Sequence, residues 1–250
     1  TNNVTVYRKV VGTLLGKNAD SLAAGVEKYC NEKLPVTLKR DQSALATYYI
    51  HEIYLCYIAG KYREALNAAR KIHDLEGSII GFLVSVEYYF FYSLAIAAAY
   101  NELPLKEKIY YMRILQKNQQ KMKEWSKNSK KNFEHKYLLI AAETARILNK
   151  KNEAMRLYDL AFQSARENGY IQYAAFASEI AAKFYFSQGL EKIGEMYIKE
   201  AYTCYSKWGA LAKAREIQNQ YPYLLGKTSF DYQQEGPSDV YEKEIILSTP

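Results

Sequence analysis

Glycine, proline and cysteine are all scarce in this sequence. Its 250 residues include 12 Gly, 5 Pro and 3 Cys, and 49% of them are hydrophobic. This composition is that of a folded chain and excludes disorder for most of its length. The cysteines Cys30, Cys56 and Cys204 are odd in number, lie far apart in the sequence and form no C-x-x-C pair. They argue against a disulfide framework and a zinc site, and favour a reducing, cytoplasmic location.

Long apolar runs are also missing. A membrane-spanning helix needs about 20 consecutive apolar residues, whereas the most apolar stretch, residues 78–100, contains Glu87 and several tyrosines. We therefore predict no membrane insertion. The chain begins TNNVTVYRKVVG, with neither an initiator Met nor the charged-then-apolar order of a signal peptide, so we expect it to be part of a longer protein.

Charge of one sign is not segregated in this chain. The net charge of +7 arises from 34 basic and 27 acidic residues that are interleaved along the sequence. A nucleic-acid-binding protein usually gathers its basic residues on one face, so we predict no nucleic-acid partner. The most basic segment, residues 117–136, is interpreted as a solvated face at a bend between two helices.

The spacing of apolar residues predicts an all-α fold. Apolar side chains recur every three or four positions, as on one face of a helix, and no segment alternates convincingly as a strand. The predicted helical segments are residues 44–59, 62–75, 84–100, 105–125, 133–148, 152–167, 171–187, 191–206 and 209–219.

The breaks between helices recur at a rough period. Gly60, Asn101, Asn149 and Gly189 each follow a helix rich in Ala, Tyr and Leu, and they are about 40 to 48 residues apart. Gly and Asn at such breaks can adopt the left-handed conformation that ends a helix. The pattern predicts TPR-like αα-hairpin repeats stacked into a right-handed superhelix. We expect N-terminal helices or a partial repeat in residues 1–40, the repeat domain in residues 41–226, and a linker or tail in residues 227–250.

Motifs that could carry catalysis are incomplete. His51 and Glu52 begin an H-E-x-x-H zinc motif, but Leu55 stands where the second His is required. Residues 226–228 (GKT) imitate the end of a phosphate-binding loop, but Tyr221 stands where the earlier Gly is required. We predict no catalytic residue, no metal and no cofactor.

Two blocks of the sequence carry a family resemblance. Residues 132–161, which include NFEHKYLL, AAETAR and EAMRLYDLA, and residues 165–225 resemble the TPR-like helical region of large multi-sensor signal transduction kinases. In those proteins a Ser/Thr-kinase-like domain and a STAND-type AAA ATPase precede this region, and a GAF sensor and a histidine kinase follow it. The resemblance implies a connector that is not itself an enzyme.

The resemblance and the repeat pattern together predict a scaffold. Its partner would be a protein or peptide, including the flanking domains of the parent protein, and the repeats would relay signals between those domains. Two alternatives stay open. One is the peptide-binding repeat domain of a transcriptional regulator, which would need a DNA-binding helix-turn-helix that this sequence does not show. The other is an enzyme with a helical active site.

If Gly60, Asn101, Asn149 and Gly189 mark the turns inside the hairpins, the first helix of each hairpin lines a concave face. Aromatic and charged side chains on those helices are then candidates for binding a partner, since such groups are enriched among binding hot spots. The alternative is that the tyrosines, of which the chain has 25, fill gaps in the packing and the charges are solvated. The candidate residues are Tyr54, Tyr57, Tyr88, Glu143, Arg146, Glu179 and Lys183.

Overall fold

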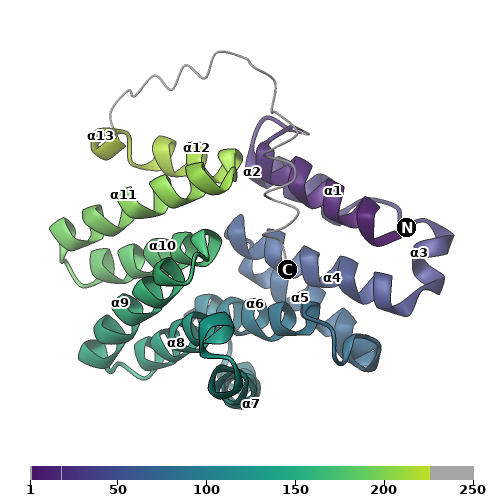
Figure 1. Cartoon of the computed structure of the whole chain (residues 1–250), viewed down its shortest axis with the longest axis horizontal. Helices are drawn as coiled ribbons and strands as arrows, with labels where there is room; N and C mark the ends of the chain where they lie inside the picture. Colours follow the sequence, from purple (N-terminus) through teal and green to yellow (C-terminus); the bar gives the residue numbers. More distant parts are fainter. Residues whose placement is uncertain (1, 18, 226–250) are drawn as a thin grey trace.

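The structure is a computed structural model that describes residues 2–17 and 19–225 (Figure 1). Within these residues the chain is built from helices and short connections, with no strand. The predicted all-α fold of stacked helical hairpins is confirmed. The predicted linker at residues 227–250 and the GKT sequence at residues 226–228 lie outside the described residues.

Four helical hairpins form the body of the described part of the chain. They pair α4 (Gln42–Ile58) with α5 (Tyr62–Ile72), α6 (Val84–Ala99) with α7 (Leu105–Asn128), α8 (Lys130–Ile147) with α9 (Lys151–Glu167), and α10 (Ile171–Ser187) with α11 (Glu191–Trp208). The 3-10 helices η1 (His73–Ile79) and η2 (Tyr100–Glu102) precede and follow α6. Along the chain, the hairpins are preceded by α1 (Asn2–Leu15), α2 (Leu22–Cys30) and α3 (Val36–Arg40) and followed by α12 (Leu211–Gln220) and α13 (Pro222–Leu225).

Local chemistry explains where several helices begin and end. The Asp41 side chain accepts a hydrogen bond from the Ala44 amide at 3.0 Å and caps the start of α4. The predicted turn at Asn149 has φ of 57°, which Asn tolerates better than most residues with a Cβ, and the turn at Gly60 has φ of 72°. Asn101 differs from the prediction: it lies within η2, and Pro104 then precedes the first residue of α7.

The first helix of most hairpins is buried on nearly every side. In α4, α6 and α10, residues on all faces are buried, because each helix is packed against its own partner, the neighbouring hairpins and the interior of the superhelix. The second helices α5 and α9 keep an exposed polar face. No helix in residues 2–17 and 19–225 combines the length and the apolar character that crossing a membrane requires.

The superhelix curves until its two ends meet. Figure 1 shows the hairpins arranged in an arc, with α12 returning to the side of α1 and α2. The helix α1 packs against both α4 and α12. Across this junction Lys213 of α12 donates a hydrogen bond from Nζ to the carbonyl of Ile58, at the end of α4, at 2.9 Å. The N-terminal helices therefore contact both the first hairpin and the last helices of the stack.

Aromatic rings fill the interior of this closed arc. Tyr54 of α4, Phe91 of α6 and Phe176 of α10 meet with edge-to-face geometry. Their ring centroids are 4.8 Å apart for Tyr54 and Phe91 and 5.4 Å for Phe91 and Phe176. Edge-to-face pairs add about 0.5–1.5 kcal/mol beyond the burial of their area. The interior is thus a core that joins three hairpins, including the first and the last.

Candidate functional site

The seven side chains predicted on a concave face come from the first helices of the four hairpins. Most are buried in contacts between helices, and Lys183 is the most exposed, with 47% of its side chain accessible. Their role in binding a partner stays a prediction. The buried residues are Tyr54, Tyr57, Tyr88, Glu143 and Glu179, and Arg146 is partly buried.

Glu143 and Arg146 belong to one network that ties α8 to two neighbours. Arg146 donates from Nε and Nη2 to the two carboxylate oxygens of Glu143, at 2.9 and 2.7 Å, and from Nη2 to the carbonyl of Ala97 in α6 at 2.7 Å. Tyr158 of α9 donates its hydroxyl to Glu143. Burial would lower the pKa of Arg146, but the charge and the hydrogen bonds of the Glu143 carboxylate outweigh burial, so the pKa lies above its usual value. The guanidinium stays charged and acts as a bridge between hairpins.

Glu179 and Lys183 belong to a second network, which fastens α10 to α12. Glu179 accepts from Lys183 at 2.7 Å, from Lys213 at 3.0 Å and from the Tyr205 hydroxyl at 2.7 Å. Burial would raise the pKa of Glu179, but the two ammonium groups and the Tyr205 hydroxyl lower it well below the usual range. The carboxylate is therefore ionised. Because Lys213 also bonds to the Ile58 carbonyl, this network lies at the junction of α4, α10 and α12.

The structure brings some of the predicted residues together and separates others. Tyr57, Glu179 and Lys183 line one small cavity with residues of α5 and α11. Tyr54 packs into the aromatic core, and Tyr88 stacks on Tyr92 of its own helix, with ring centroids 5.6 Å apart. Sequence periodicity placed these side chains on the right helices, but it does not show how far the arc closes over them.

A buried ion pair that the sequence pattern does not predict joins α6 and α8. Lys136 of the basic segment 117–136 was interpreted as solvated, and this is wrong: its ammonium is buried, pairs with Glu87 and lies 4.1 Å from the centroid of the Tyr173 ring. Burial lowers the pKa of Lys136, and Glu87 opposes that change. The signal was the single carboxylate in the apolar stretch 78–100, because a buried charge requires a partner.

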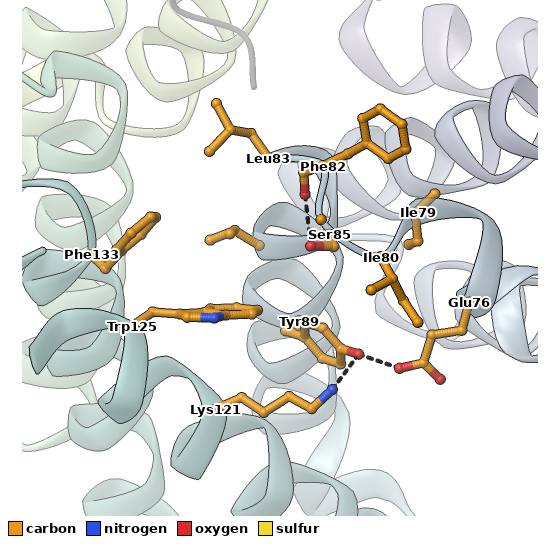
Figure 2. Close-up of a pocket in the computed structure, with 12 residues that line it drawn as sticks. Glu76, Ile79, Ile80, Phe82, Leu83, Ser85, Tyr89, Lys121, Trp125 and Phe133 are labelled. Carbon is orange, nitrogen blue, oxygen red and sulfur yellow. Dashed lines mark hydrogen bonds between the residues drawn. The ribbon is translucent and has the colours of Figure 1, made fainter. Parts of the chain in front are cut away.

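A surface pocket of about 360 Å³ opens beside η1, α6 and α7 (Figure 2). The short connection from η1 to α6 exposes Ile80 (76%), Phe82 (59%) and Leu83 (73%) at its rim. Exposed apolar side chains in one contiguous group are typical of an interaction surface. The side chains that line the pocket also include Glu76, Ile79, Ser85, Val86, Tyr89, Lys121, Trp125 and Phe133.

Aromatic and charged groups meet on the floor of this pocket. Tyr89 donates its hydroxyl to Glu76 and accepts a hydrogen bond from Lys121 Nζ at 2.7 Å, as Figure 2 shows. The Lys121 ammonium also lies 4.2 Å from the centroid of the Tyr89 ring, and the Trp125 ring is 5.6 Å from that ring. Burial, followed by the Glu76 carboxylate, raises the pKa of Tyr89. The floor is thus a neutral phenol held between an anion and a cation.

The incomplete zinc motif has a structural role. His51 is buried, bonds through Nδ1 to the Thr47 carbonyl at 2.7 Å and packs edge-on against Tyr7. Glu52 pairs with Lys71 at 2.8 Å instead of facing His51. Among residues 2–17 and 19–225 no group of three His, Cys, Asp or Glu side chains is arranged to hold a metal ion.

Comparison with known proteins decides the family. A family model described as CHK1-like, TPR repeats matches residues 37–208. The chain belongs to this family. The matched TPR repeats run from α3 to the end of α11, so they include all four hairpins and every residue of the surface pocket. The helices α1, α2 and α12, which close the arc, lie outside the match.

Part of the chain is similar to a signalling protein. Over 106 residues, or 42% of this chain, the sequence is 31% identical to hybrid signal transduction histidine kinase G of Dictyostelium discoideum. The matched stretch amounts to 3% of that protein's length. No solved structure matches the chain. The resemblance to repeats of kinase-type signalling proteins is confirmed at this level, and the domain layout of the parent protein stays a prediction.

Proposed function

We propose that this chain is a non-catalytic TPR scaffold, part of a larger signal transduction protein, that binds a protein or peptide and relays signals between flanking domains. The observation that carries the proposal is the surface pocket, where Ile80, Phe82 and Leu83 are exposed beside the aromatic floor of Tyr89 and Trp125. TPR repeats are built from neighbouring hairpins, and a pocket that spans two hairpins is a natural place for a partner to bind.

A protein segment fits this surface better than a small molecule. A ligand confined to the pocket would cover Tyr89 and Trp125, but it would leave Phe82 and Leu83 exposed at the rim, where Figure 2 shows them. A peptide that places one apolar side chain in the pocket and continues across the rim would cover both. Protein interfaces have this arrangement of an apolar centre with a polar border.

The charge around the pocket indicates which residues should flank the apolar side chain that the partner places in the pocket. Lys121 lies at the pocket, and residues 117–136 contain seven Lys against two Glu. Although Lys136 is buried, most of these lysines are exposed on α7 and at the start of α8. We therefore propose an acidic segment with large apolar side chains as the occupant, since opposite charge at the border favours association and sets orientation.

The proposal can be tested with selected peptides. A library of random peptides displayed on phage is panned on the full chain, with counter-selection on the Phe82→Ser variant. The two tryptophans are Trp125 and Trp208, so a Trp208→Phe background leaves Trp125, at the pocket, as the fluorescent reporter of binding. We expect acidic, apolar peptides, with the Kd raised about tenfold or more by Lys121→Glu, a loss of about 1.4 kcal/mol.

A matched control distinguishes binding at the pocket from non-specific binding to exposed apolar side chains. Leu105 is 75% exposed at the start of α7 and does not line the pocket, so Leu105→Ser is expected to leave the Kd unchanged. Enrichment of peptides without acidic residues, or equal weakening by Leu105→Ser, would contradict the proposed partner. Titration of the same protein with nucleotides and divalent metals tests the non-catalytic part of the proposal, because saturable binding of either would favour an enzyme.

A further inference from the structure

Folding brings two of the three cysteines together. Cys30, the last residue of α2, and Cys56, in α4, are 26 positions apart in the sequence, yet their sulfur atoms are 3.5 Å apart. The spacing of cysteines along the chain does not reveal this contact, because it forms only when α2 packs on α4. Both cysteines are free thiols in the structure, and the third, Cys204, lies on α11.

A pair of tyrosines beside the thiols holds the two helices in register. Tyr29 donates its hydroxyl to the Tyr48 carbonyl at 3.2 Å, and Tyr48 donates its hydroxyl to the Tyr29 carbonyl at 2.6 Å. The two rings stack with centroids 4.7 Å apart and planes 9° from parallel. This reciprocal contact fixes the residue next to Cys30 against α4. The approach of the sulfur atoms is therefore built into the packing of α2 on α4.

The two thiols differ in access and in acidity. Cys30 is partly exposed, whereas Cys56 is fully buried, so a small reagent reaches Cys30 first. The hydrogen bond with Cys56 lowers the pKa of the Cys30 thiol, and burial opposes this effect. A thiolate is the reactive form of cysteine. The arrangement is that of an attacking thiol at the surface with a resolving thiol directly behind it.

We propose that Cys30 and Cys56 form an oxidisable dithiol site that a hydroperoxide converts to an intramolecular disulfide. The Cys30 thiolate attacks one peroxide oxygen, the O–O bond breaks, and Cys30 becomes a sulfenic acid as the other oxygen leaves as hydroxide. The Cys56 sulfur then attacks the Cys30 sulfur, the S–O bond breaks and the S–S bond forms. In total the two thiols lose two electrons and two protons, and hydrogen peroxide is reduced to two molecules of water.

The oxidised form would need little rearrangement. A disulfide has a sulfur–sulfur distance of about 2.05 Å, so the two sulfur atoms must approach by about 1.5 Å from their contact of 3.5 Å. The bond would pin α2 to α4. Because α2 contacts α12 and α4 is bonded to α12 through Ile58, the cross-link would join two helices that take part in closing the arc. A thiol reductant would reverse it.

The test counts thiols in the full chain after treatment with hydrogen peroxide. The reduced protein is oxidised while folded, then unfolded and alkylated, and mass spectrometry reports the number of alkylated cysteines. With 3 Cys in the chain, formation of one disulfide lowers the number from three to one. Cys204→Ala serves as the matched control and should go from two to none. Cys30→Ala should form no intramolecular disulfide, and neither should Cys56→Ala.

Two further measurements keep the proposal falsifiable. Oxidation in denaturant should form the Cys30–Cys56 bond at least about tenfold more slowly, since the folded chain supplies the proximity. Circular dichroism checks that each variant is folded, and Cys30→Ala, at a partly exposed position, remains informative if Cys56→Ala is not. The proposal is overturned if the folded wild type keeps three alkylatable thiols, if the bond involves Cys204 or a second chain, or if unfolding does not slow its formation.

Discussion

The junction that closes the arc and the surface pocket contain the same kinds of side chain, but these side chains have different roles. At the junction, Glu179 is bonded to two lysines and a tyrosine, and Glu179, Tyr205 and Lys213 are buried between α10, α11 and α12. At the pocket, Tyr89 links Glu76 to Lys121 in a similar way, but Phe82 and the residues beside it are exposed. A polar cluster covered by a helix of the same chain stabilises the fold. A polar cluster that the described helices leave exposed beside apolar side chains is accessible to a partner.

A decrease in pH should have the largest effect on the free energy of unfolding, and it should act through histidines buried in the interior. Burial lowers the pKa of His51 to about 4 and of His135 to about 3, in the latter case with a contribution from Lys136. In the unfolded chain each histidine takes up a proton near pH 6.5, whereas in the folded chain it stays neutral to a lower pH. The stability that depends on the neutral histidines is therefore fully present above pH 6.5 and is lost as the pH falls. Each histidine should cost about 2 kcal/mol between pH 7 and pH 5. Urea unfolding at both pH values measures the loss.

A histidine variant checks the source of this pH dependence. His135 stacks on Tyr170 at 4.6 Å, and neither ring nitrogen has a hydrogen-bond partner among the described residues, so His135→Phe preserves the packing. It should remove about half of the stability change between pH 7 and pH 5. His73, 85% exposed on η1, provides the control, and His73→Gln should leave the change as it is. An unaltered pH dependence in His135→Phe would contradict this account.

Removal of the carboxylate at the junction should have the next largest effect. Among the described residues, Glu179→Ala leaves buried Lys213 with only the Ile58 carbonyl and Glu216 to compensate its charge. We expect a loss of about 3 kcal/mol in the free energy of unfolding, as when one partner of a buried ion pair is removed. Lys183→Ala removes the more exposed partner of the same carboxylate and should cost no more than about 1 kcal/mol. Equal losses in the two variants would mean that the junction is not the stabilising element.

Arg146→Ala tests whether the predicted concave face is structural or binds a partner. The change leaves Glu143 buried with Tyr158 as its remaining hydrogen-bond donor among the residues that the structure describes, and it removes the link to Ala97. We expect a loss of about 2 kcal/mol in the free energy of unfolding, with the affinity of the selected peptides unchanged. The opposite result, unchanged stability and weaker binding, would place the partner on the concave face, as the sequence predicted.

The smallest effect on stability is expected at the pocket. Phe82→Ser exchanges a side chain that is 59% exposed, so the free energy of unfolding should change by no more than about 0.5 kcal/mol. The same change should weaken binding of the selected peptides about tenfold or more. Thermal unfolding and fluorescence titration of one protein sample give both values. A large loss of stability would show that the connection from η1 to α6 is part of the core.

The sequence by itself determined the helices and their hairpins. Apolar periodicity is a local property, and the residues that end the helices, such as Gly60, Asn149 and Gly189, act through their own backbone conformation. The family resemblance in residues 132–225 likewise depends on sequence alone, and the match to TPR repeats supports it.

Only the tertiary structure decided how far the superhelix curves and what it covers. Curvature is the sum of small rotations between hairpins, so it depends on contacts between residues far apart in the chain, such as Lys213 with Ile58. That closure buries Tyr57 and Glu179, which periodicity had placed on an open face. The approach of Cys30 to Cys56 and the pairing of Glu87 with Lys136 are of the same kind. No local pattern encodes them, because each partner satisfies its neighbour only after the helices have packed.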